Sequence, residues 1–131
     1  MKKYIFIVSL LCLLAACTGK RQGEAAVEVA ALPAVEDVVM YQVNPRVFAP
    51  EKSFKAVERR LDSIQALGIN VVWFMPINEV GQEKSVNSPY CVKDYKGVNP
   101  EFGTLDEFKA LVATCHQKGM NVIIDWVANH T

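Results

Sequence analysis

The sequence carries no excess of charge of either sign, because its 14 Lys and Arg residues equal its 14 Asp and Glu residues. Two of the basic residues, Lys2 and Lys3, stand at the very start of the chain. The remainder is therefore slightly acidic and offers no basic patch of the kind that binds nucleic acid. We accordingly expect no nucleic-acid partner.

The chain also lacks an apolar run long enough to span a membrane. Its longest apolar stretch, residues 5–16, is well short of the roughly 20 residues of a transmembrane helix. A basic start, a short apolar core and a small-residue exit predict a secretory signal peptide. The exit, Leu14-Ala15-Ala16-Cys17, resembles the bacterial lipoprotein cleavage box, in which the cysteine is diacylated and becomes the first mature residue. The alternative is an ordinary signal peptide with an incidental cysteine.

This interpretation divides the chain into three parts. We expect a lipoprotein signal peptide at 1–16, a tether at 17–36 with no clear amphipathic period, and a folded domain at 37–131. Lipidation of Cys17 would anchor the protein to the membrane of the bacterial cell envelope. Thr18, rather than an acidic residue, follows the cysteine, which favours the outer membrane.

Within the expected domain, apolar runs alternate with helical periodicity. The runs cover residues 38–43, 69–75 and 120–125, and the second is almost continuously apolar, which suits a strand covered on both faces. Helical spacing of three and four joins five apolar residues: Phe54, Val57, Leu61, Ile64 and Leu67. A capping box at Thr104 and Glu107 predicts a second helix that ends at Gly119.

Strands alternating with helices predict a parallel α/β sheet. Either an open doubly wound sheet or the first three βα units of an eight-stranded barrel would satisfy this pattern. The helices lack glycine-rich turns at their starts, which weakens a dinucleotide-binding interpretation. In both architectures functional groups gather beyond the carboxyl ends of the strands. Residues 44–48, 78–103 and 125–131 fall there, and polar residues in such places can also simply cap and satisfy loop backbone.

Motifs along the chain resemble the α-amylase family of glycoside hydrolases. Asp125-x-x-x-Asn129-His130 is similar to that family's first signature region. Further segments follow in the family's order: residues 41–48, residues 67–77, Tyr90, Asp94-Tyr95, Asn99-Pro100, Phe102-Gly103-Thr104 and His116-x-x-Gly119. The resemblance covers about residues 38–131 and implies the opening part of an incomplete (β/α)8 barrel.

The resemblance also implies roles for individual residues. Tyr90 matches the aromatic residue that stacks on the sugar at the cleavage subsite, and His130 matches the histidine that hydrogen-bonds the same sugar. Asp125 matches an acidic residue that supports the site, and Asn129 matches a possible calcium ligand. Two features depart from the family: residues 49–53 lack a calcium loop rich in Asp and Asn, and Pro89 replaces the usual Gly before Tyr90.

The implied activity is cleavage or transfer of α-glucosidic bonds in α-glucan or maltooligosaccharide, with retention of configuration, which needs two carboxylic residues. In the family these come from strands beyond the third, so we assign no catalytic residue here and expect this chain alone to be inactive. The more natural roles of Asp94, Glu101 and Asp106 are in turns and caps. The alternative function is a non-catalytic glucan-binding lipoprotein or a truncated product.

Four cysteines are present, of which only Cys91 and Cys115 lie in the expected domain. Cys91 belongs to the loop at the carboxyl ends of the strands, whereas Cys115 lies about 16 Å down the following helix at 1.5 Å per residue. A disulfide needs Cα atoms within about 7 Å. We therefore expect these two thiols to remain unpaired.

The lipid anchor gives the first testable prediction. A Cys17→Ala variant that is still cleaved should leave the membrane fraction, because each buried CH₂ of an acyl chain contributes about 0.8 kcal/mol to membrane binding. Fractionation followed by detection of the protein checks this. Membrane retention of the cleaved variant would show that Cys17 is not the anchor.

Overall fold

The computed structural model describes residues 31–129. Three short parallel strands form one sheet in the order β1-β2-β3: β1 (Met40–Val43), β2 (Val71–Phe74) and β3 (Asn121–Ile124). The predicted alternation of strands and helices is confirmed, with each strand shorter than its apolar run. The second run forms the central strand, as its continuous apolar character indicated.

The first predicted helix is divided in two. It consists of α3 (Ser53–Glu58) and α4 (Leu61–Gln65), because the Arg60 N–H bonds the carbonyl of Val57, three residues back, and tightens the turn. Four of the five predicted core residues on this stretch are buried. Leu67 is not, since it lies in the turn that follows α4 and is 68% exposed. Gly68 completes that turn at φ +81°, a conformation that favours glycine.

Two further short helices stand near β1. The 3-10 turn η2 (Val35–Asp37) precedes the strand, and α2 (Pro45–Phe48) follows it. Helix α2 was not predicted, although the sequence contains helix-start signals for it. Asn44 accepts a hydrogen bond from the Arg46 N–H at 3.1 Å, and Pro45 occupies the first helical position. This turn directs the chain away from the end of β1.

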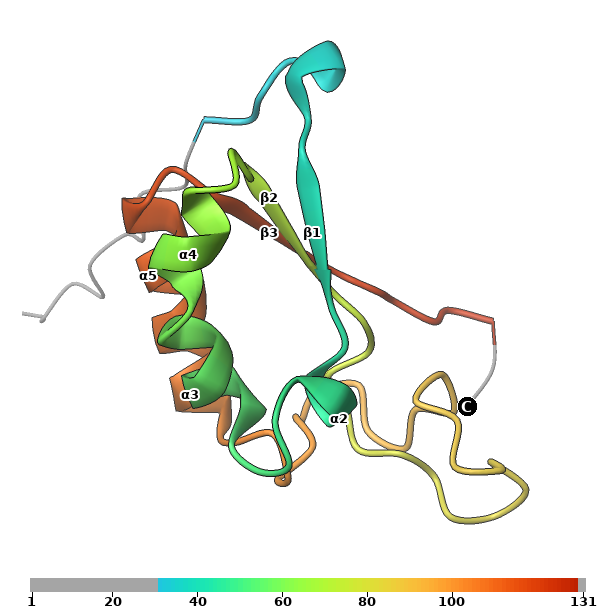
Figure 1. The fold of residues 1–131 in the computed structure, drawn as a ribbon. Helices are drawn as coiled ribbons and strands as arrows, with labels where there is room; N and C mark the ends of the chain where they lie inside the picture. Colours follow the sequence, from blue (N-terminus) through green and yellow to red (C-terminus); the bar gives the residue numbers. More distant parts are fainter. Residues whose placement is uncertain (1–30, 130–131) are drawn as a thin grey trace, which may run out of the picture.

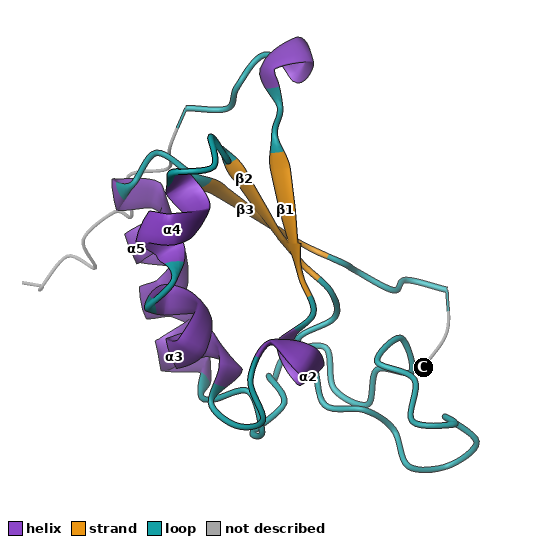
Figure 2. Ribbon diagram, viewed as in Figure 1, coloured by secondary structure: helices purple, strands orange, loops and turns teal. Residues whose placement is uncertain are grey.

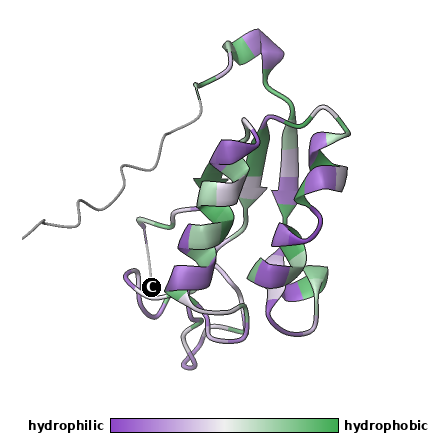
Figure 3. Ribbon diagram, turned by 90° about the vertical axis from the view of Figure 1, so that its left-hand side faces the viewer, coloured by the Kyte–Doolittle hydropathy of each residue, from purple (hydrophilic) through white to green (hydrophobic). Residues whose placement is uncertain are grey.

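Helices α3, α4 and α5 (Leu105–Gln117) lie together on one side of the sheet (Figure 1). The strand register places one row of alternate side chains against them. Val43, Val72 and Phe74 of this row are buried and Tyr41 and Val122 are partly buried, whereas Ile124 at the end of β3 is 41% exposed. Hydrophilic and hydrophobic residues alternate along the helices (Figure 3). The core therefore lies between the helices and one face of the sheet.

Aromatic rings join the two helical segments to the sheet. The rings of Phe54 and Phe108 lie 4.9 Å apart, and that of Phe108 lies 5.4 Å from Phe74. Phe102 meets Phe54 edge-on at 6.1 Å. Each buried ring contributes about 1.5–3 kcal/mol through burial alone. Phe102 thus fixes the end of the loop before α5 to the core.

The long segment between β2 and α5 is irregular, as its polar composition indicated (Figure 2). One isolated antiparallel bridge joins Val80 to Val92, whose side chain is 2% exposed. Asn78 donates through Nδ2 to the carbonyls of Asp94 and Gly97 at 3.1 and 2.8 Å. A few inward contacts therefore hold this loop beneath the carboxyl ends of the strands.

The turn and cap roles expected of the acidic residues agree with the structure. Asp94 Oδ1 accepts from the Lys96 N–H at 2.8 Å, and Asp106 lies in the first turn of α5. Glu101 follows Asn99 in a turn, where its N–H donates to Asn99 Oδ1 at 3.0 Å. None of these three residues follows a strand of the described sheet directly.

Cys91 and Cys115 are both free thiols, which confirms the prediction that they do not pair. Cys115 is fully buried among the core residues of α5, and this burial raises the pKa of its thiol to about 12, with a smaller contribution from Glu58. It therefore behaves as a small apolar core residue. None of the helices between residues 31 and 129 has the length and apolar character needed to cross a membrane.

The capping box at the start of α5 is confirmed and gives a second prediction. The Glu107 N–H donates to Thr104 Oγ1 at 3.1 Å, and the Thr104 N–H donates to Glu107 Oε2 at 2.9 Å. In the full-length protein, Thr104→Ala should lower the free energy of unfolding by about 1 kcal/mol. Chemical denaturation measures this, with Lys109→Ala, an exposed mid-helix change, as the matched control. Equal stability of the two variants would contradict a stabilising cap.

Candidate active site

Asp125 is the first residue beyond β3. Its N–H donates to the Phe74 carbonyl at 2.9 Å, which extends the β2–β3 pairing by one step. Alternation along the strand places Asp125 on the same face as Ile123, away from the helices. This position at the carboxyl end of a parallel strand is where functional groups collect in α/β folds.

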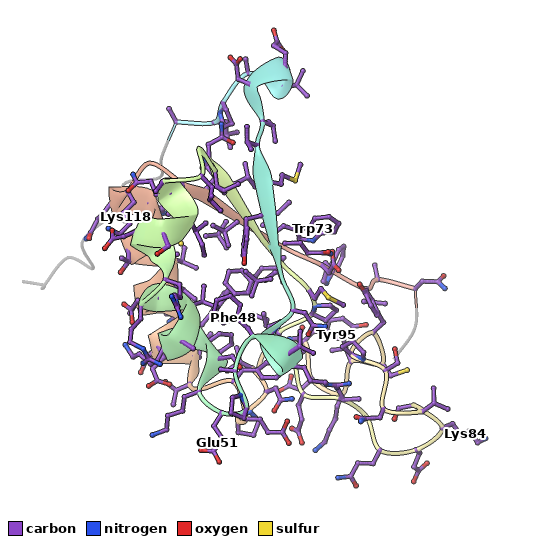
Figure 4. The ribbon with its side chains drawn as sticks, in the orientation of Figure 1. Phe48, Glu51, Trp73, Lys84, Tyr95 and Lys118 are labelled. Carbon is purple, nitrogen blue, oxygen red and sulfur yellow. The ribbon has the colours of Figure 1, made fainter. Side chains whose placement is uncertain are left out.

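The Asp125 carboxylate is held through both of its oxygens. Oδ1 accepts from the indole Nε1–H of Trp73 at 2.6 Å, and Oδ2 accepts from the Tyr90 hydroxyl at 2.9 Å. Trp73 lies on the side of the sheet opposite the helices (Figure 4). One side chain from a strand and one from the loop thus converge on a single carboxylate.

Tyr90 reaches this point from the long loop. Its side chain is 37% exposed, so part of the ring remains accessible while the hydroxyl is bonded. The hydrogen bond to Asp125 raises the pKa of the Tyr90 phenol, and partial burial and the charge of Asp125 act in the same direction. The hydroxyl therefore stays protonated at neutral pH and serves as a donor.

Two other contacts position the same loop. The Tyr95 hydroxyl donates to the carbonyl of Val127, two residues beyond Asp125. Arg46, from α2, donates through its guanidinium to the carbonyl of Asn87 at 2.8 Å. The loop is consequently tied to the segment after β1 and to the segment after β3.

A cavity of about 300 Å³ adjoins Asp125. Its lining includes Asn78, Tyr95, Leu105, Ile124 and Trp126, so it combines apolar walls with a few polar groups. A larger hollow of about 620 Å³ lies beside the loop and Arg46. That hollow contains none of Trp73, Tyr90 and Asp125, and we do not assign it to the site.

The structure brings Tyr90 and Asp125 together, whereas other predicted site residues lie elsewhere or outside the described residues. His130 and Cys17 are outside the described residues. Asn129 is described and exposed. Residues 31–129 contain no group of three or more His, Cys, Asp or Glu side chains that could hold a metal ion. The calcium role of Asn129 stays a prediction.

The sequence-based interpretation assigned no role to Trp73 or Tyr95. A signal for Trp73 exists, because it is the one residue of the apolar run 71–75 whose side chain carries a strong hydrogen-bond donor. Buried tryptophans usually find a partner for that N–H. The partner of Tyr95 is a backbone carbonyl, for which the sequence carries no signal.

Comparison with known proteins supports one family. The model of the alpha amylase catalytic domain matches residues 51–131. An alpha-glucosidase of Apis mellifera is 33% identical over 101 residues, which cover 73% of this chain and 17% of that protein. A probable oligo-1,6-glucosidase of Bacillus subtilis is 34% identical over 101 residues, which cover 73% of this chain and 18% of that protein. The amino acid transporter heavy chain of Rattus norvegicus is 37% identical over 97 residues, covering 70% and 14%.

Solved structures agree with this. A maltogenic alpha-amylase from Thermotoga neapolitana superimposes with a TM-score of 0.66 at 32% identity, covering 70% of this chain and 23% of that chain. Trehalose-6-phosphate hydrolase from Bacillus licheniformis superimposes with a TM-score of 0.66 at 29% identity, covering 76% of this chain and 18% of that chain. The sequence given spans less than a fifth of the length of the curated relatives named here. The three βα units are therefore an incomplete (β/α)8 barrel rather than an open sheet, and the chain belongs to the α-amylase catalytic-domain family.

Proposed function

We propose that the full-length protein is a glycosidase of the α-amylase type that acts on α-glucans or their oligosaccharides with retention of configuration. The observation that carries this proposal is the junction of Tyr90 and Asp125 at the carboxyl end of β3. A partly exposed aromatic ring thus contacts Asp125, the first residue of the signature segment. Relatives named as an α-glucosidase and an oligo-1,6-glucosidase support the substrate class.

Tyr90 is proposed to form the platform on which the sugar stacks. A pyranose ring has an apolar face, and an aromatic ring with a fixed tilt presents a complementary surface. The Tyr90 hydroxyl is bonded to Asp125, which holds the far end of the ring in place. We assign His130 to hydrogen bonding with the hydroxyls of the same sugar.

Asp125 is proposed to support the site rather than to react. Both of its oxygens already accept hydrogen bonds from protein donors, at 2.6 and 2.9 Å. Such donors reduce the nucleophilicity of a carboxylate, because they stabilise the charge that an attacking carboxylate would have to share. We assign the nucleophile and the general acid to no residue of this chain.

The predictions on location and metal binding remain part of the proposal. We propose lipid anchoring of Cys17 in the bacterial envelope, with the outer membrane favoured by Thr18. A calcium ion on Asn129 would need further oxygen ligands. Its chemistry would be structural, since Ca²⁺ would hold the loop after β3 without entering the reaction.

A non-catalytic role is the second candidate. The observation in its favour is that an amino acid transporter heavy chain, a protein not named as an enzyme, is 37% identical to this chain over 97 residues. In that case the domain would serve as a binding lipoprotein, and Tyr90 would contribute to sugar affinity alone.

Assays of the full-length protein separate the two candidates. We expect hydrolysis of α-1,4- or α-1,6-linked glucose oligosaccharides, and the first product seen by NMR should be the α-anomer, because retention requires two displacements. The absence of turnover on both linkages, together with measurable oligosaccharide binding, would favour the non-catalytic role. A β-anomeric first product would contradict the proposed reaction type.

Substitutions at the sugar platform give a third prediction. Tyr90→Ala and His130→Asn should each reduce kcat and kcat/KM by roughly 10- to 150-fold, corresponding to about 1.5–3 kcal/mol. Contacts that tighten as the sugar flattens toward the transition state lower the barrier, whereas uniform contacts change only KM. Steady-state kinetics on a chromogenic maltooligosaccharide measures this.

The matched control is Thr104→Ala, which removes the cap of α5 and should leave kcat unchanged. If Tyr90→Ala and His130→Asn behave like this control, neither residue contacts the reacting sugar and the signature has a structural role in this protein.

A further inference from the structure

We propose that Trp73 is a positioning residue of this site: its indole N–H fixes the Asp125 carboxylate, and that carboxylate fixes the orientation of the Tyr90 ring. This inference rests on the proposed function only for its effect on the reaction. The chain of contacts itself, from strand to carboxylate to loop, stands on two hydrogen bonds of 2.6 and 2.9 Å.

The three residues differ in how firmly the fold holds their backbone. Trp73 lies in β2, where it is paired with Gln42 of β1 on one side and with Ile123 of β3 on the other. Asp125 lies just beyond the end of β3, and Tyr90 lies on the long loop. The central strand therefore fixes the position of Trp73, and the hydrogen bonds through Asp125 pass that constraint on to Tyr90. A side chain on a loop without such bonds would be held less precisely.

Strand geometry explains why Trp73 and Asp125 meet. Trp73 is level with Ile123, and Asp125 lies two residues further along on the same face. Diagonal neighbours of this kind on adjacent strands are about 7–8 Å apart between backbones, a distance that a long aromatic side chain can reach across. A Phe at position 73 would fill similar space and would carry no donor.

The chemistry of the indole suits a fixed support. Its N–H only donates and does not titrate, so the bond to Asp125 Oδ1 is present whenever the carboxylate is ionised. A hydrogen bond to a charged acceptor is shorter and stronger than one between neutral groups. With Oδ1 held, the rotation of the carboxylate is restricted and Oδ2 faces the Tyr90 hydroxyl. The alternative is that Trp73 only fills space on this face of the sheet.

A spectroscopic titration of the full-length protein tests the link without any enzymatic activity. The raised pKa of the Tyr90 phenol means that its bond to Asp125 is intact at neutral pH and is lost as pH rises through the folded-state pKa. Phenolate absorbance of wild type minus that of Tyr90→Phe isolates this group. In Trp73→Phe we expect Tyr90 to titrate at lower pH, toward its ordinary value of 10.0.

The matched control is Trp126→Phe, the same chemical change at the only other tryptophan of the printed sequence, which is 77% exposed. It should leave the titration of Tyr90 unchanged. A folded Trp73→Phe protein in which Tyr90 titrates as in wild type would overturn the proposal, because the Trp73 N–H would then have no influence on the phenol.

Steady-state kinetics of Trp73 variants provide a second test. Trp73→Phe should lower kcat about tenfold, the effect of losing one hydrogen bond to a charged group, with a smaller change in KM. In an Asp125→Asn background the same substitution should cause little further loss, because residues that act through one another are not additive. Equal losses in both backgrounds would show that Trp73 acts independently of Asp125 and would also overturn the proposal.

If circular dichroism shows that Trp73→Phe is unfolded, Trp73→Met, which also lacks a hydrogen-bond donor and fills space flexibly, replaces it in the kinetic cycle. If the wild-type protein hydrolyses no α-glucoside, the proposed function fails, while the titration of Tyr90 still decides whether Trp73 positions Asp125.

Discussion

The arrangement of this molecule depends on the parallel pairing of β2 with strands on both sides. Because it pairs with β1 and with β3, its backbone is the most constrained in the described sheet. One of its faces places Val72 and Phe74 in the helix-covered core, and the other presents Trp73. The same four residues therefore carry the packing that holds the fold and the donor that reaches the site. A shift of register by one residue would exchange these two faces.

The loop between β2 and α5 shows how a long irregular segment can hold a side chain in a defined position. It contains few regular hydrogen bonds, yet buried Val92 and Phe102 attach it to the apolar interior. Tyr90 and Tyr95 then join it to Asp125 and to the carbonyl of Val127. The two buried apolar residues fix the path of the loop, and the two hydroxyls fix its contact with the segment that follows β3. Long loops in compact domains are usually of this functional kind.

Most of the fold could be predicted from the sequence because periodicity reports burial directly. It did not report the break at Arg60, where the same apolar face continues through a change in hydrogen bonding. The Trp73–Asp125 contact was within reach of prediction, since alternation places both residues on one face. The Tyr90–Asp125 contact was not, because the two residues are 35 positions apart and Tyr90 lies on a long loop whose path is set by tertiary contacts such as the Val80–Val92 bridge. The family resemblance supplied what physical reasoning from the sequence could not.

The bonding of Asp125 also bears on how the chemistry of the site must be divided. A carboxylate that attacks or protonates a substrate needs one oxygen available to it, either for bond formation or for a proton. Here the donors of Trp73 and Tyr90 occupy one oxygen each. The same bonds that would hinder Asp125 as a reactant make it effective as a support, because a carboxylate held through both oxygens has a defined position. In the proposed function, the described strands contribute the frame, Tyr90 of the loop contributes the proposed sugar platform, and the reacting carboxylates are a separate requirement of the mechanism.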